Sequence, residues 1–304
     1  MTEPTSPGRA ADKARIRAAF DRAAGRYDAE AVLQHRVGAD LDERLELIRL
    51  QPERILDIGT GSGRQAEALV RRYPKAELIA ADLAPAMVAA ARARLDSGRG
   101  WRPWRRRARF AVADIERLPF TDSGFDLVLS NLTLQWCPEP RFAFEEVRRV
   151  LRPGGLFMFT TFGPDTLKEL RLAWEAVDGS PHVNPFLDMH DLGDALMGAQ
   201  FADPVMDVEF FRLTYPDVQA VMRDLKGIGA QTVLNRGRRG LLGRQALATL
   251  ESSYEEWRED GVLPSTWEVV HGHAWAPDTP RQQRSGETTT VSLGQLRGSL
   301  GRSA

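Results

Sequence analysis

The chain has 304 residues, of which 42% are hydrophobic and 27% are charged, so it contains enough apolar material for a folded core and is not disordered throughout. Its 41 lysines and arginines nearly balance its 42 aspartates and glutamates, which argues against a dedicated nucleic-acid-binding protein. The single cysteine, Cys137, excludes an intrachain disulfide and a cysteine-rich metal site.

The two ends of the chain differ in composition from its middle. Residues 1–9 are polar and contain proline, and residues 278–304 are rich in small and polar side chains, so we expect a disordered N-terminal tail and a flexible C-terminal tail. The N-terminus lacks the apolar segment of a signal peptide, and no apolar run approaches the roughly 20 residues that span a bilayer. We therefore expect a cytoplasmic protein without membrane or nucleic-acid partners.

Residues 10–50 have a helical pattern, because apolar side chains recur there at spacings of three and four, as in Ile16, Phe20 and Ala23. We expect them to form an N-terminal helical lid. Between residues 51 and 163, short apolar segments alternate with helical ones. The predicted strands are Arg54–Ile58, Glu77–Ala81, Arg109–Ala113, Phe125–Ser130 and Gly155–Thr161. Apolar strands separated by helices predict an α/β fold with a doubly wound, Rossmann-like parallel sheet and helices on both faces.

The pattern stays mixed between residues 164 and 277, which we expect to form a substrate-side insertion after the fifth strand together with the final strands of the same sheet. The predicted helices are Asp188–Ala199, Pro216–Lys226 and Arg244–Glu259, and the predicted strands are Pro204–Tyr215 and Thr266–Ala274. Within the core, the segment 97–109 carries two tryptophans and six arginines. A solvated loop is its simpler interpretation, and a docking patch for an acidic partner is the alternative.

A glycine-rich turn joins the first predicted strand to the next helix and reads Asp57-Ile-Gly59-Thr-Gly61-Ser-Gly63. The backbone amides of such a turn face outward, so a ligand can approach them closely. The dinucleotide-binding fingerprint requires glycine or alanine where this chain has Arg64. The pattern instead resembles motif I of the class I S-adenosylmethionine-dependent methyltransferases, in which an acidic residue precedes the glycines.

The resemblance continues at the ends of the later strands. It implies that Asp82 accepts hydrogen bonds from the ribose hydroxyls and that Asp114 contacts the adenine amino group. The full set of expected cofactor-binding residues is Asp57, Gly59, Gly61, Gly63, Asp82, Leu83, Asp114, Ile115 and Asn131. Each residue alone has a structural explanation as a tight turn or a helix cap. S-adenosylmethionine is a sulfonium cation without a phosphate, so three carboxylates at the ends of adjacent strands suit it better than a pyrophosphate.

Some methyltransferase chemistries do not fit the sequence. The segment Ser130-Asn-Leu-Thr133 lacks the Pro-Pro-aromatic motif of amino-methylating nucleic-acid enzymes, and Cys137 is interpreted as structural rather than as a nucleophile. His271 and His273 lie on one face of the last predicted strand. They could hold a metal, but packing is the simpler explanation, and we expect no metal site.

Segments outside the cofactor-binding motifs indicate which methyltransferase family the chain resembles. Residues 20–28, 162–171, 188–193, 224–230 and 267–277 resemble the malonyl-acyl carrier protein O-methyltransferases of biotin synthesis. The resemblance covers about residues 15–277, and Thr60 stands where many relatives carry cysteine. It implies that the free carboxylate of a malonyl thioester receives the methyl group, giving the ester that primes pimeloyl synthesis. Because a carboxylate is already ionised near neutral pH, this reaction needs no general base.

The resemblance also suggests residues for the substrate. Arg171 could grip one carboxylate oxygen, although a helix-surface position explains it equally well, and Tyr27 is a candidate lid residue or a core residue. Acyl carrier protein is acidic, so a basic docking face is expected, unless coenzyme A is the carrier. The candidate docking residues are Arg223, Lys226, Arg236, Arg238 and Arg239.

Two alternatives to this function stay open. The segment 163–167 also resembles a mitochondrial assembly-factor branch that modifies an arginine of another protein. A non-catalytic binding or assembly protein that keeps only the cofactor pocket is the third possibility.

Overall fold

The computed structural model describes residues 7–97, 108–178, 182–228 and 243–278. Most of the basic segment 97–109 and of both predicted tails lies outside the described residues. Helix α1 begins at Pro7, inside the predicted N-terminal tail. The helices that precede residue 151 in the chain are α1 (Pro7–Ala23), α2 (Tyr27–Glu30), α3 (Val32–Glu46), α4 (Arg64–Arg72), α5 (Pro85–Ser97) and α6 (Pro140–Val150), with a 3₁₀ turn at Leu134–Trp136. The helices later in the chain are α7 (Lys168–Asp178), α8 (Met189–Gly198), α9 (Val218–Gly227) and α10 (Arg244–Glu255).

The strands form one seven-stranded sheet with the order β3-β2-β1-β4-β5-β7-β6. They are β1 (Arg54–Ile58), β2 (Glu77–Asp82), β3 (Ala108–Val112), β4 (Phe125–Ser130), β5 (Leu151–Phe162), β6 (Ala202–Tyr215) and β7 (Leu263–Trp275). The first five strands pair in parallel, as predicted. Strand β7 inserts antiparallel between β5 and β6, so the last two strands lie in the reverse of their chain order.

Alternate residues of the strands pack on opposite faces of the sheet, which is why the core strands are apolar throughout. Leu56 and Ile58 of β1 belong to one buried cluster, which α6 and α8 cover. Ile55 of the same strand belongs to another, which α3, α4 and α5 cover. The doubly wound arrangement therefore follows directly from strands that are buried on both faces.

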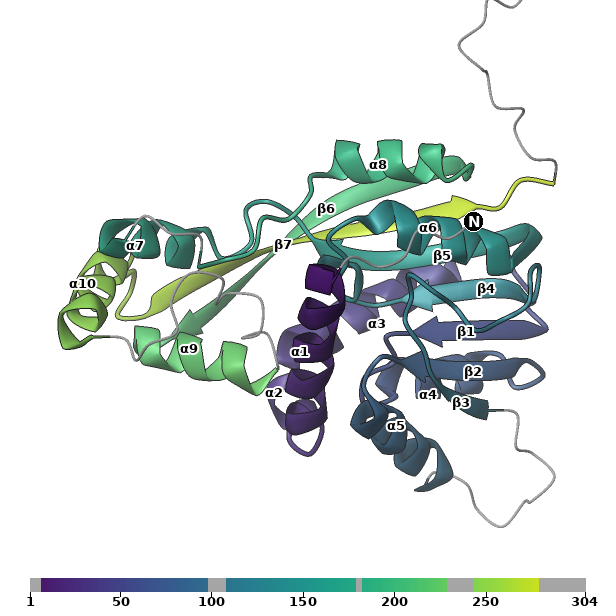
Figure 1. Ribbon diagram of the computed structural model, residues 1–304, viewed down its shortest axis with the longest axis horizontal. Helices are drawn as coiled ribbons and strands as arrows, with labels where there is room; N and C mark the ends of the chain where they lie inside the picture. The colour runs from purple at the N-terminus through teal and green to yellow at the C-terminus, as the bar shows by residue number, and fades with distance from the viewer. Residues whose placement is uncertain (1–6, 98–107, 179–181, 229–242, 279–304) are drawn as a thin grey trace, which may run out of the picture.

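The segments after the fifth strand add helices in two places, as the predicted order of helices and strands implies. Helices α7 and α8 lie between β5 and β6, and α9 and α10 lie between β6 and β7. Figure 1 shows α7, α9 and α10 gathered on the part of β6 and β7 that extends beyond the rest of the sheet. There they build a third apolar cluster around Trp267 and Val269 of β7. None of the helices that the structure describes is long and apolar enough to span a membrane.

The pairing of β7 with β5 leaves no space for a side chain at position 272. A Cβ atom on Gly272 would lie 2.3 Å from Cζ of Phe159, whose ring is fully buried. We expect Gly272→Ala to lower the free energy of unfolding by about 1–3 kcal/mol through overpacking. Urea denaturation measures the change. Gly198→Ala is the matched control, because nothing lies within 4 Å of its added Cβ. Equal urea midpoints for both variants would contradict this account of the sheet.

Candidate functional site

The glycine turn after β1 adopts backbone angles that only glycine takes easily, with φ values of +77°, +54° and +84° at Gly59, Gly61 and Gly63. A Cβ on Gly59 would lie 1.9 Å from Oγ1 of Thr133, and one on Gly63 would lie 2.7 Å from Cα of Ala91. The first and third glycines therefore let other chain segments approach closely.

Two carboxylates stand behind this turn. Asp82, at the end of β2, accepts hydrogen bonds from the amides of Gly61 (3.0 Å) and Ala84 (2.9 Å). Asp57, in β1, accepts one from the hydroxyl of Thr60 at 2.5 Å. Because both are removed from water, burial raises the pKa of Asp82 to about 6 and that of Asp57 to about 7. Desolvation favours the neutral form of both carboxyls, and the hydrogen bonds donated to them favour the charged form.

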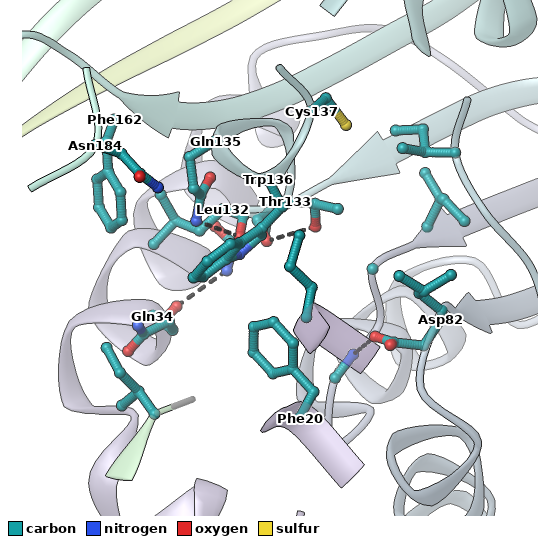
Figure 2. Close-up of a pocket in the computed structure, with 18 of the residues that line it drawn as sticks. Phe20, Gln34, Asp82, Leu132, Thr133, Gln135, Trp136, Cys137, Phe162 and Asn184 are labelled. Carbon is teal, nitrogen blue, oxygen red and sulfur yellow. Dashed lines mark hydrogen bonds between the residues drawn. The ribbon is translucent and has the colours of Figure 1, made fainter. Parts of the chain in front are cut away.

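A cavity opens at the carboxyl ends of the strands. Its volume, mouth included, is about 1210 Å³. We call one end the aspartate half; it is lined by Ile58, Gly59, Gly61, Asp82, Leu83, Ala113, Asp114 and Ile115. We call the other end the aromatic half; it is lined by Phe162, Leu167, Val183, Asn184, Phe186, Leu225, Ile228 and Trp267. Residues 131–137 lie between them, and Figure 2 shows Asp82 on the opposite side of the cavity from Phe162 and Asn184.

A second, polar cavity of about 740 Å³ lies against the other side of the glycine turn. Asp57 lines this cavity, whereas Gly63 lines neither, so the structure gives Gly63 a packing role beside α5. Gly59, Gly61, Asn131 and Tyr27 border both cavities. The structure thus brings most of the expected cofactor-binding residues to one place.

Helix α1 crosses the aspartate half and brings a cation to it. Lys13 forms ion pairs with Asp114 and Glu116, and it lines the cavity together with Ile16 and Phe20 of the same helix. Sequence analysis missed Lys13. Its spacing of three from Ile16 puts both side chains on one helix face, which is the signal that could have revealed it.

Tyr27 lies over the glycine turn, with its ring carbon Cε1 3.5 Å from the position of a Cβ on Gly61. Burial, and then the charge of Asp82, raise the pKa of its phenol, so the side chain stays neutral. Asn131 connects the sheet to α3: its amide donates to the carbonyl of Gln34 at 3.0 Å, and its Oδ1 accepts from Thr160 at 2.7 Å. These contacts hold the N-terminal helices against the cavity.

Arg171 is not among the residues that line the cavity. Its Nη2 donates to the carbonyl oxygens of Pro164 (2.7 Å) and Thr166 (2.8 Å), so in this structure the guanidinium holds the turn before α7. A role as carboxylate anchor stays a prediction. Cys137 is buried at the cavity wall.

The histidine pair lies within the sheet. His271 of β7 is buried and neither ring nitrogen has a hydrogen-bond partner, although Nε2 lies 3.7 Å from Oε2 of Glu209; desolvation lowers the pKa of this imidazole to about 4. Burial also lowers the pKa of His273. Within the described part of the chain, no group of three His, Cys, Asp or Glu residues is placed to hold a metal ion.

The raised pKa of Asp57 has a consequence for stability. Its native carboxyl keeps a proton up to about pH 7, whereas an unfolded aspartate releases it near 3.8, so this residue lowers stability as pH rises through that window. We expect Asp57→Asn to raise the free energy of unfolding at pH 8 by roughly 2–4 kcal/mol and to have little effect at pH 4. Urea denaturation at both pH values measures the difference, and a pH-independent difference would contradict it.

Comparison with known proteins agrees with this geometry. A family model described as a methyltransferase domain matches residues 56–159. The fold is similar to that of a putative methyltransferase from Bacillus halodurans (TM-score 0.55, 20% identity, covering 79% of this chain and 99% of that one). It is also similar to that of the YcgJ protein from Bacillus subtilis (TM-score 0.56, 16% identity, covering 79% and 98%).

Several curated relatives are similar over nearly the whole chain. A malonyl-[acyl-carrier protein] O-methyltransferase from Laribacter hongkongensis is 52% identical, covering 88% of this chain and 90% of its own. Proteins of the same name from a Methylovorus species and from Coxiella burnetii are 50% and 36% identical, covering 88% and 94% of this chain and 90% and 96% of their own. Because these identities lie between 36% and 52% and the matches cover most of both chains, the chain belongs to the malonyl-[acyl-carrier protein] O-methyltransferase family.

Proposed function

We propose that this chain transfers the methyl group of S-adenosylmethionine to the free carboxylate of malonyl-acyl carrier protein, and that the ester primes pimeloyl synthesis for biotin. The observation that carries the proposal is that one cavity has two different halves, one bordered by carboxylates and the glycine turn, the other by aromatic side chains. A cationic, hydroxyl-rich methyl donor suits the first half. A small acyl group suits the second.

The residues in the aspartate half fit S-adenosylmethionine. The glycine turn leaves room at Gly61, and Asp82 retains lone pairs beyond the two that accept backbone amides. The residues that would contact the donor are Gly59, Gly61, Asp82, Leu83, Asp114, Ile115 and Asn131. Asp57, which lines the second cavity, would support the glycine turn from behind through Thr60. A ligand at Asp114 would share that carboxylate with Lys13 or displace it.

The proposed reaction requires no acid–base catalysis by the protein. Bound S-adenosylmethionine supplies an electrophilic methyl group: a carboxylate oxygen bonds to the methyl carbon while the carbon–sulfur bond breaks and its electron pair stays on sulfur. Because the carboxylate is ionised near neutral pH, no residue needs to remove a proton. The chain's contribution is to orient the two reactants and to exclude water. The α1 side chains Ile16 and Phe20, together with Tyr27, cover the cavity and serve this purpose.

The malonyl group can be carried by acyl carrier protein or by coenzyme A. Acyl carrier protein is the carrier in the names of the relatives, and coenzyme A stays the alternative. Arg223 and Lys226 are exposed on α9, next to the cavity-lining Leu225 and Ile228, which supports a docking role for this helix. Arg236, Arg238 and Arg239 lie outside the described residues.

The role of Asp82 in donor binding can be tested against a matched carboxylate. Asp126 also accepts two backbone amides, from Glu53 (2.9 Å) and Arg54 (2.8 Å), but does not line the cavity. An asparagine offers only one oxygen. We therefore expect Asp82→Asn to weaken S-adenosylmethionine binding at least about tenfold in calorimetry, and Asp126→Asn to leave it unchanged. Equal affinities for the two variants would remove Asp82 from the site.

The reaction itself is tested with methyl-labelled S-adenosylmethionine and malonyl-acyl carrier protein, with malonyl-coenzyme A in parallel. We expect base-labile label on the malonyl group, and the faster of the two substrates identifies the carrier. Tight binding of the donor without transfer to either thioester would contradict the proposal. It would favour a relative of the assembly-factor branch, whose substrate is a protein, or a non-catalytic role.

A further inference from the structure

The aromatic half of the cavity offers a carboxylate no free cation. Lys13 is the only lysine or arginine among the described residues that line the cavity, and it is paired with Asp114 and Glu116 in the other half. Arg171 donates to backbone carbonyls. A carboxylate that enters this half leaves its water behind, so it needs hydrogen-bond donors from the protein.

One buried donor in this half has no acceptor. Trp267, from the extended part of β7, is 2% exposed, and its Nε1 has no hydrogen-bond partner. An indole nitrogen can only donate, and the ring packs in an apolar cluster with Phe162, whose centroid lies 5.1 Å away. A buried donor without an acceptor lowers stability, which is expected where a ligand completes the bond.

A second neutral donor lines the same half of the cavity. Asn184 supplies it from the segment before α8. Phe186, two residues further along, is in ring contact with Phe162 (centroids 5.6 Å apart), which is in ring contact with Trp267. The amide of Asn184 can donate two hydrogen bonds. Two side chains with neutral donors, Trp267 of β7 and Asn184 of this segment, thus line the half of the cavity that the proposed function gives to the malonyl group.

We propose that the indole N–H of Trp267, with the amide of Asn184, holds one oxygen of the malonyl carboxylate. This inference rests on the proposed function and names the carboxylate anchor within it. A neutral donor fixes one oxygen without neutralising the charge, so the other oxygen keeps its ability to attack the methyl carbon. In the protein alone the Nε1 is sealed from solvent, so the substrate enters with a side-chain adjustment that exposes it.

Binding of malonyl-coenzyme A, and of the methyl ester of malonyl-coenzyme A, tests the anchor in the presence of S-adenosylhomocysteine. We expect Trp267→Phe, which removes the N–H and keeps an aromatic ring, to weaken binding of the acid at least about tenfold. Binding of the ester, which has lost the charge, should change less than about twofold. Trp174→Phe is the matched control, because Trp174 is buried in the same apolar cluster but does not line the cavity.

Asn184→Asp gives a second measurement that does not depend on core packing, because Asn184 is only partly buried. Its added charge should repel the acid and spare the ester. Unchanged binding of the acid to Trp267→Phe would overturn the proposal. An equal loss for acid and ester would also overturn it, since the ring would then act through its shape. Because these measurements record binding rather than turnover, they decide the question even for a chain that transfers no methyl group.

Discussion

The burial of carboxylates at the ends of β1 and β2 is the constraint on which the rest of the site depends. Taking Asp57 and Asp82 out of water is unfavourable, and it raises the pKa of both. The glycine turn offsets part of this cost, because the amide of Gly61 can point at Asp82 only when the turn adopts positive φ angles. A cationic ligand would offset more of it.

Polar contacts add to the apolar packing that holds the N-terminal helices over this edge of the sheet. Lys13 pairs with Asp114, Asp28 accepts from Ser62 and pairs with Arg94, and the amide of Asn131 donates to α3. Such contacts can exchange for contacts with a ligand or with water at modest cost.

The aromatic half of the cavity is built by apolar packing rather than by buried charges. The pairing of β7 with β5 and β6 carries the sheet beyond its Rossmann-like core, and α7, α9 and α10 cover the extension. This arrangement produces an apolar wall beside the carboxylate-lined half of the cavity. A reaction between a carboxylate and a sulfonium benefits from such a wall, because both charges react faster when water does not solvate them. Position and desolvation replace acid–base catalysis.

Local patterns along the chain determined the core of this protein. The apolar runs of β1 to β5, the glycine turn and the carboxylates at the strand ends are each encoded within a few residues. The fold class therefore followed from periodicity, and the expected donor site from the family resemblance that the turn and the carboxylates carry. The position of β7 was not encoded in this way, because antiparallel insertion depends on pairing between residues more than a hundred positions apart, such as Phe162 and Val269.

The same limit applies to individual side chains. The pairing of Lys13 with Asp114 and the binding of Arg171 to backbone carbonyls depend on which surfaces meet after folding, as does the unpartnered nitrogen of Trp267. The sequence by itself therefore determined what kind of chemistry the sheet edge supports, since that depends on residue types at strand ends. Only the tertiary structure decided which donors and charges face the cavity, because long-range packing, not local spacing, sets the partners of a buried polar group.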